Sequence, residues 1–169
     1  MRTHKLAAAA ALAVALTLDL TLPSAADAVI KVSLWDKADM MGKMDMGKSM
    51  GMGMGPGMHR KMGMGPMGIN VDTATAAAGK VTFEVTNISK ETIHEMIVAP
   101  IESVDVVLPY NANENRVDEE AAKDLGEVAE LEPGKGGTLT LDLKPGLYVL
   151  YCNIPGHFMA GMWTVLAVK

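Results

Sequence analysis

Side chains with soft donor atoms gather near the end of the chain. The segment 151–163 contains the only cysteine of the sequence, followed by a histidine and two methionines: Cys152, His157, Met159 and Met162. A thiolate, an imidazole and a thioether in one loop are the ligand types that select copper, provided that a second imidazole comes from elsewhere. His94, within an apolar run, is the candidate for that imidazole. These residues predict one copper ion, with His94, Cys152 and His157 in a plane and Met162 as a weak axial ligand.

Each of these residues also has an ordinary structural interpretation. A lone buried cysteine commonly packs as a small apolar residue. His94 on a strand can be a hydrogen-bonded core residue, and His157 can be an exposed loop residue. Met159 and Met162 can both be packing residues, and Met159 is the rival to Met162 as the axial ligand. We favour the metal interpretation because the three residue types occur together, and because a free thiol in an exported protein needs burial or a metal to escape oxidation.

The runs that must position these donors have the patterns of β-strands. Residues 80–86 alternate, with Val81, Phe83 and Val85 on one face, and residues 147–152 are apolar on both faces, as in a central strand. The other predicted strands are 29–35, 69–73, 93–99, 104–108, 138–143 and 163–168. An acidic first turn and a closing glycine predict one short helix over 118–126. The pattern predicts an all-β, Greek-key β-sandwich of about seven or eight strands.

The first 28 residues have the features of a secretory signal peptide. A basic head with Arg2 and Lys5 precedes an apolar run over 6–18, and Ala26-Asp27-Ala28 offers a small-x-small cleavage pattern. An uncleaved membrane anchor is the alternative, but the run is short for a bilayer span. We therefore expect a signal peptide over 1–28 and a mature protein in the periplasm with no membrane span.

A segment rich in methionine and glycine, 36–67, separates the first strand, 29–35, from the remainder of the domain, 68–169. It contains eleven methionines, and its glycine content opposes both helix and strand, so we expect a flexible loop. One interpretation is low-complexity filler. The other is a tract that binds extra copper(I) or silver(I), because thioether sulfur is a soft ligand.

The charge of the predicted domain limits its partners. Residues 68–169 carry 7 basic and 15 acidic residues, a net charge of −8, whereas residues 36–67 have a net charge of +2. Nucleic acid and anionic lipid both require a basic face. An acidic domain therefore excludes both classes of partner and favours a basic protein.

The ligand loop resembles that of a known family. The run Cys152-Asn153-Ile154-Pro155-Gly156-His157, followed by Gly161-Met162, resembles the C-terminal ligand loop of the cupredoxins, the blue copper proteins such as plastocyanin and azurin. Its spacing is most similar to that of rusticyanin, and Thr92-Ile93-His94-Glu95-Met96 resembles the upstream ligand motif. The resemblance implies one type 1 copper and electron transfer. Many members have an asparagine after the first histidine, where it helps to tie the ligand loops together; here that residue is Glu95.

Two functions follow from these expectations. The first is a periplasmic, monomeric electron carrier whose partner is a cytochrome or oxidase. The alternative is a storage, delivery or resistance protein that binds copper(I) or silver(I) through the methionine-rich segment and passes it to a copper acceptor protein. An enzyme such as a multicopper oxidase is disfavoured, because the mature chain would have only three histidines, His59, His94 and His157, too few for a second metal centre.

Overall fold

This computed structural model describes residues 27–37 and 65–169. The predicted signal peptide, 1–28, and the predicted loop, 36–67, lie outside the described residues except at their margins. Within the described part, no helix has the length and apolar character needed to cross a bilayer.

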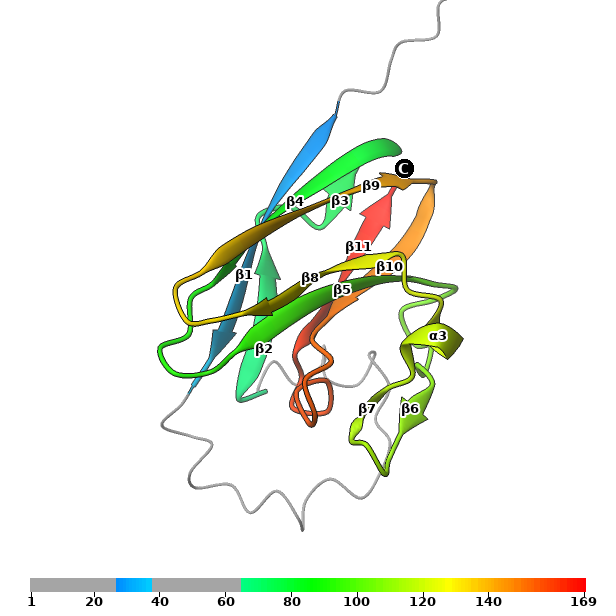
Figure 1. Cartoon of the computed structure of the whole chain (residues 1–169). Helices are drawn as coiled ribbons and strands as arrows, with labels where there is room; N and C mark the ends of the chain where they lie inside the picture. The colour runs from blue at the N-terminus through cyan, green and yellow to red at the C-terminus, as the bar shows by residue number, and fades with distance from the viewer. Residues whose placement is uncertain (1–26, 38–64) are drawn as a thin grey trace, which may run out of the picture.

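In the first sheet, the N-terminal strand β1 is an interior strand. The strand order of this sheet is β2-β1-β4-β9 (Figure 1). The bounds are Ala28–Asp36 for β1, Met67–Val71 for β2, Gly79–Asn87 for β4 and Gly136–Leu143 for β9. β1 pairs in parallel with β4, and the other two pairings are antiparallel. The inward-facing Val81, Phe83 and Val85 of β4 are buried, as their alternation predicted.

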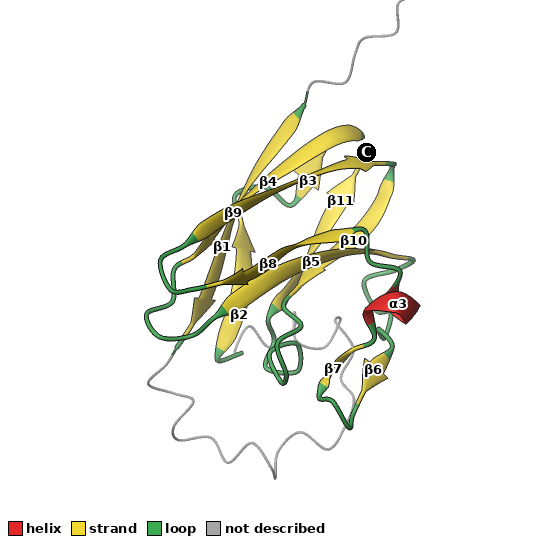
Figure 2. Cartoon of the chain, viewed as in Figure 1, coloured by secondary structure: helices red, strands yellow, loops and turns green. Residues whose placement is uncertain are grey.

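The second sheet carries the two strands next to the predicted ligands. Its order is β3-β11-β10-β5-β8 (Figure 2). The bounds are Thr75–Ala76 for β3, His94–Ile101 for β5, Gly126–Leu131 for β8, Gly146–Tyr151 for β10 and Trp163–Val168 for β11. β10 is central and antiparallel to both β5 and β11. Because β10 and β5 run antiparallel, the end of β10 lies beside the first half of β5.

Apolar side chains cover both faces of this second sheet. Leu150 and Met96 belong to the core between the sheets, whereas Val149 and Ile97 belong to a second cluster on the outer face. The outer cluster is completed by residues of the connection 102–125, including Leu108. Burial on both faces explains why β10 is apolar throughout.

The predicted all-β sandwich is confirmed. In the described residues, eight strands have five residues or more, in agreement with the expected number. The predicted strand 104–108 is wrong: Val106 and Leu108 pack against the outer cluster in irregular backbone. The short strands β6 (Tyr110–Asn111) and β7 (Arg116–Val117) and the strand β8 were not predicted.

The predicted helix exists but is shorter than 118–126. α3 spans Glu119–Ala122, and the Asp118 side chain accepts a hydrogen bond from the Ala121 backbone N–H. Lys123 adopts a left-handed conformation, with φ of 56°, and ends the helix. Gly126, with φ of 142°, then begins β8.

Candidate metal centre

Three predicted donors come together at one end of the sandwich. His94 begins β5, Cys152 directly follows β10, and His157 lies in the connection to β11. His94 Nδ1 is 3.3 Å from His157 Nδ1, and the Cys152 sulfur is 3.4 Å from the same His157 nitrogen. The three donor atoms lie within 4.8 Å of one another. At most 8% of any of these residues is exposed.

The turn before β5 fixes the first histidine. Asn87, at the end of β4, is fully buried, and its side-chain amide donates to the carbonyls of Thr92 and Leu131 at 2.8 Å each. Its side-chain oxygen accepts from the backbone and hydroxyl of Ser89. These bonds satisfy the turn internally and hold His94 at the beginning of its strand.

The ligand loop is closed by backbone hydrogen bonds among the ligands themselves. The N–H of Cys152 donates to the carbonyl of Met162 at 3.0 Å, and the N–H of Met162 donates to the carbonyl of His157 at 3.1 Å. Gly156 turns the loop with φ of 87° and donates to the carbonyl of Asn115 at 2.7 Å. Backbone hydrogen bonds therefore fix the positions of the predicted ligands Cys152, His157 and Met162 in this loop.

Met162 and Met159 pack in different places. Met162 is fully buried and belongs with Cys152 to the core between the sheets. Met159 is half-buried and packs against the outer cluster with Phe158. Met162 therefore shares a buried cluster with Cys152, whereas Met159 packs on the other face of the sheet.

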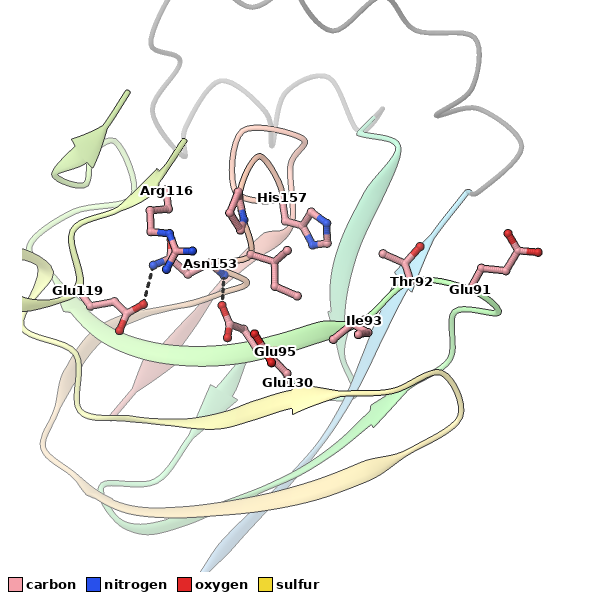
Figure 3. Close-up of a pocket in the computed structure, with 11 residues that line it drawn as sticks. Glu91, Thr92, Ile93, Glu95, Arg116, Glu119, Glu130, Asn153 and His157 are labelled. Carbon is pink, nitrogen blue, oxygen red and sulfur yellow. Dashed lines mark hydrogen bonds between the residues drawn. The ribbon is translucent and has the colours of Figure 1, made fainter. Parts of the chain in front are cut away.

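Asn153 and Glu95 join the two ligand segments, and sequence reasoning missed the first of them. Glu95 accepts a hydrogen bond from the Asn153 backbone N–H at 2.9 Å (Figure 3). Glu95 thus makes the connection that the resemblance assigns to asparagine. The Asn153 side chain also binds both backbone groups of Val117 and donates to Glu119 at 2.7 Å. Only the position of Asn153 directly after the cysteine could have pointed to it.

Burial keeps the donor cluster uncharged when no metal is bound. It lowers the pKa of His157 to about 4, with a smaller contribution from His94. Burial also lowers the pKa of His94, although Asp36 opposes the shift. Burial raises the pKa of the Cys152 thiol to about 12 and that of Glu95 to about 7. A metal bound here would have to displace the thiol proton, so binding would release a proton.

The donor set fits a first-row transition metal. Bonds of about 2.0–2.1 Å to nitrogen and about 2.3 Å to thiolate sulfur, with trigonal angles, need donor separations of roughly 3.5–3.8 Å. Two of the three separations, 3.3 and 3.4 Å, are within a few tenths of an ångström of that range, and all three donor atoms lie within 4.8 Å of one another. Two imidazoles and one thiolate in such a cluster are the ligands of copper electron-transfer sites.

A pocket of about 420 Å³ opens beside His157 (Figure 3). The charged residues that line it are four glutamates and one arginine: Glu91, Glu95, Glu119, Glu130 and Arg116. Pro155 at its rim is exposed, whereas Phe158 is only 5% exposed and packs on Tyr151. The pocket next to the cluster therefore has mainly carboxylates among its charged residues.

Comparison with known proteins shows similarity in structure alone. No family model and no curated protein matches the sequence. Rusticyanin from Thiobacillus ferrooxidans matches with 18% identity over 83% of this chain and 77% of that chain, with a TM-score of 0.50. A second structure, described as the copper protein rusticyanin, has 16% identity over 83% and 78% and the same TM-score. The fold is that of the cupredoxins.

An auracyanin from Roseiflexus castenholzii also matches this cupredoxin fold, at 18% identity over 86% of this chain and 99% of that chain, with a TM-score of 0.46. The rusticyanin structures confirm the expected cupredoxin β-sandwich. The cluster of His94, Cys152 and His157 lies at the end of the cupredoxin sandwich where that resemblance expected it.

Proposed function

We propose that this chain is a mononuclear type 1 copper protein that carries single electrons. The observation that carries the proposal is the convergence of two imidazole nitrogens and one sulfur in a buried cluster at the end of a cupredoxin sandwich. His94, Cys152 and His157 would hold the copper ion, and Met162 would supply a further thioether ligand. Bound copper supplies a couple between two oxidation states, and the protein contributes the donors.

The rigidity of the donors suits electron transfer. Cys152 follows a central strand, and backbone bonds join it to Met162 and Met162 to His157. The Asn153 network fixes the loop from the outside. Donors held in this way change little in position between oxidation states, which keeps the reorganisation cost of each transfer low.

The electron leaves through His157, which lines the acidic pocket. Carboxylates around that point favour a basic redox partner, such as a cytochrome or oxidase, and their attraction weakens with salt. We further infer a monomer in the periplasm that is not an enzyme. The predicted signal peptide supports the location.

Copper(II) added to the purified protein tests the proposal. An intense visible band from thiolate to copper is expected, absent in Cys152→Ser. Met162→Leu should change the band and the reduction potential, whereas the matched control Met159→Leu should leave both unchanged. A sample that remains colourless with copper bound would refute the type 1 assignment.

The alternative function, binding and delivery of copper(I) or silver(I), is favoured by where the methionine-rich segment meets the fold. Asp36 lies next to His94, and a side chain at Gly65 would touch the Ala160 carbonyl. Both ends of the segment therefore lie at the metal end of the sandwich. Deletion of residues 38–64 should impair tolerance to copper or silver and preserve the visible band. Unchanged tolerance would leave electron transfer as the function.

A further inference from the structure

Asp36 is the last residue of β1 and lies against His94. Its Oδ2 atom is 3.4 Å from His94 Nε2, while His94 Nδ1 is 3.3 Å from His157 Nδ1. The imidazole of His94 thus lies between a carboxylate and the donor cluster. The parallel pairing of β1 with β4 aligns Leu34 with Asn87 and brings the end of β1 to this point.

Both side chains are removed from water. The exposed fraction is 2% for the Asp36 side chain and 0% for that of His94. Over residues 27–37 and 65–169, neither Asp36 Oδ2 nor His94 Nε2 has a hydrogen-bond partner, and the polar contact between the two atoms is their separation of 3.4 Å. A buried carboxylate without a partner is costly, and a ring N–H at Nε2 reduces that cost.

We infer that Asp36 is a positioning residue of the metal centre, one that fixes the tautomer of His94 and favours the divalent over the monovalent state of the bound ion. The inference rests on the proposed function of the cluster as a copper site. Asp36 lies outside the ligand motifs and nearly sixty residues before His94, so only the fold brings the two together.

The first part of the inference follows from the chemistry of imidazole. A neutral ring has one N–H and one lone pair. With the proton on Nε2, His94 donates to Asp36, and its Nδ1 lone pair faces the cluster. With the proton on Nδ1, the Nε2 lone pair would face a buried carboxylate and repel it. Histidine ligands usually donate their second N–H to such a partner, which orients the ring and raises its basicity.

The second part follows from charge. The Cys152 thiolate and the Asp36 carboxylate together carry two negative charges in a region shielded from water. With a divalent ion, these two charges give a net charge of zero; with a monovalent ion, the net charge is −1. Net charge in a medium of low dielectric constant is penalised, so Asp36 favours the oxidised state.

The tautomer is measured on the metal-free full chain by NMR of ¹⁵N-labelled histidine. We expect His94 to carry its proton on Nε2 in the wild type. A proton on Nδ1 would overturn the inference. This measurement needs no substitution and no copper, so it decides the role of Asp36 even if a variant fails to fold or the chain fails to bind copper.

The charge is tested with Asp36→Asn, which keeps an oxygen that can accept from Nε2 but removes the negative charge. In the copper-loaded protein, the ratio of affinities for copper(II) and copper(I) should fall about tenfold or more, which raises the reduction potential by about 59 mV or more. Asp72→Asn is the matched control: Asp72 is exposed at the opposite end of the same hairpin and accepts from the Lys31 N–H at 3.0 Å. Its potential should equal that of the wild type.

The two proposals fail in different ways. If the wild type binds no copper, the proposed function is wrong, and the tautomer of His94 still decides whether Asp36 positions it. If the wild type is blue but Asp36→Asn has the same potential as Asp72→Asn, the proposed function stands and the role of Asp36 in setting the oxidation state is wrong.

Discussion

Replacing Asn153 by alanine should destabilise the protein strongly. Its side-chain oxygen accepts from the Val117 N–H at 2.7 Å, and its amide donates to the Val117 carbonyl at 2.9 Å and to Glu119 at 2.7 Å. Asn153 and Val117 are each 1% exposed, so water cannot replace the lost partner. The three bonds connect the residue after Cys152 to β7 and α3.

The size of the effect follows from these bonds. Each of the two neutral bonds to Val117 contributes about 1 kcal/mol, and the bond to the Glu119 carboxylate contributes about 1.5–3 kcal/mol. In the variant, the backbone N–H and carbonyl of Val117 stay buried without a hydrogen bond, so water does not restore the lost free energy. The free energy of unfolding should therefore fall by roughly 3–5 kcal/mol, a large part of the total for a domain of this size.

Urea denaturation of the metal-free protein, followed by tryptophan fluorescence, measures the loss. Asn111→Ala is the matched control, because the Asn111 side chain accepts from two exposed backbone N–H groups, those of Asn113 and Glu114. The control should lose less than about 1 kcal/mol. If Asn153→Ala loses no more than the control, the network does not stabilise the ligand loop.

Three further predictions concern pH, packing and thiol reactivity. Because burial raises the pKa of Glu95 from 4.5 to about 7, the folded metal-free protein holds this proton more tightly than the unfolded chain, and the associated stability is lost as pH rises from 4.5 to 7. The stability of the wild type relative to Glu95→Gln should fall across that window in denaturation curves, and a constant difference would contradict it. A Cβ at Gly68 would lie 2.7 Å from the Trp35 indole, so Gly68→Ala should cost about 1–3 kcal/mol in a thermal melt. Gly146→Ala, with no neighbour closer than 3.9 Å, should cost less than about 1 kcal/mol; equal losses would exclude the steric cause. Burial raises the pKa of Cys152 to about 12, so the folded metal-free thiol should react with iodoacetamide at pH 8 far more slowly than the urea-unfolded chain, and equal rates by mass spectrometry would show that the site opens freely.

Strands with a regular apolar pattern could be predicted from the sequence. The alternation of Val81, Phe83 and Val85 identified β4, and the apolar run before Cys152 identified a central strand. The metal cluster could also be predicted, because the cysteine and histidine of one loop lie only five residues apart and His94 begins the neighbouring strand. The strand alternation and the Cys152–His157 spacing are local patterns, whereas His94 is brought to the cluster by the pairing of β5 with β10.

Features that depend on contacts between distant segments could not be predicted. Val106 and Leu108 have the apolar character of a strand but cover the outer face of the second sheet without pairing. β8 was missed because Val128 is its only buried residue, which leaves no alternation to detect. Asp36 has no motif around it, and although Asn153 lies within the ligand-loop motif, the roles of both residues depend on which backbone or ring the fold places beside them.

The pairing of β1 with β2 places Asp36 opposite Met67, and the Lys37 N–H donates to the Pro66 carbonyl at 2.7 Å. The described residues on either side of 38–64 therefore lie side by side, with no gap between them. Doubling the length of a loop between fixed ends costs only about 0.6 kcal/mol. The number of thioether sulfurs in this insertion can thus increase or decrease over evolution, or by engineering, while the register of the strands that hold the donors is preserved.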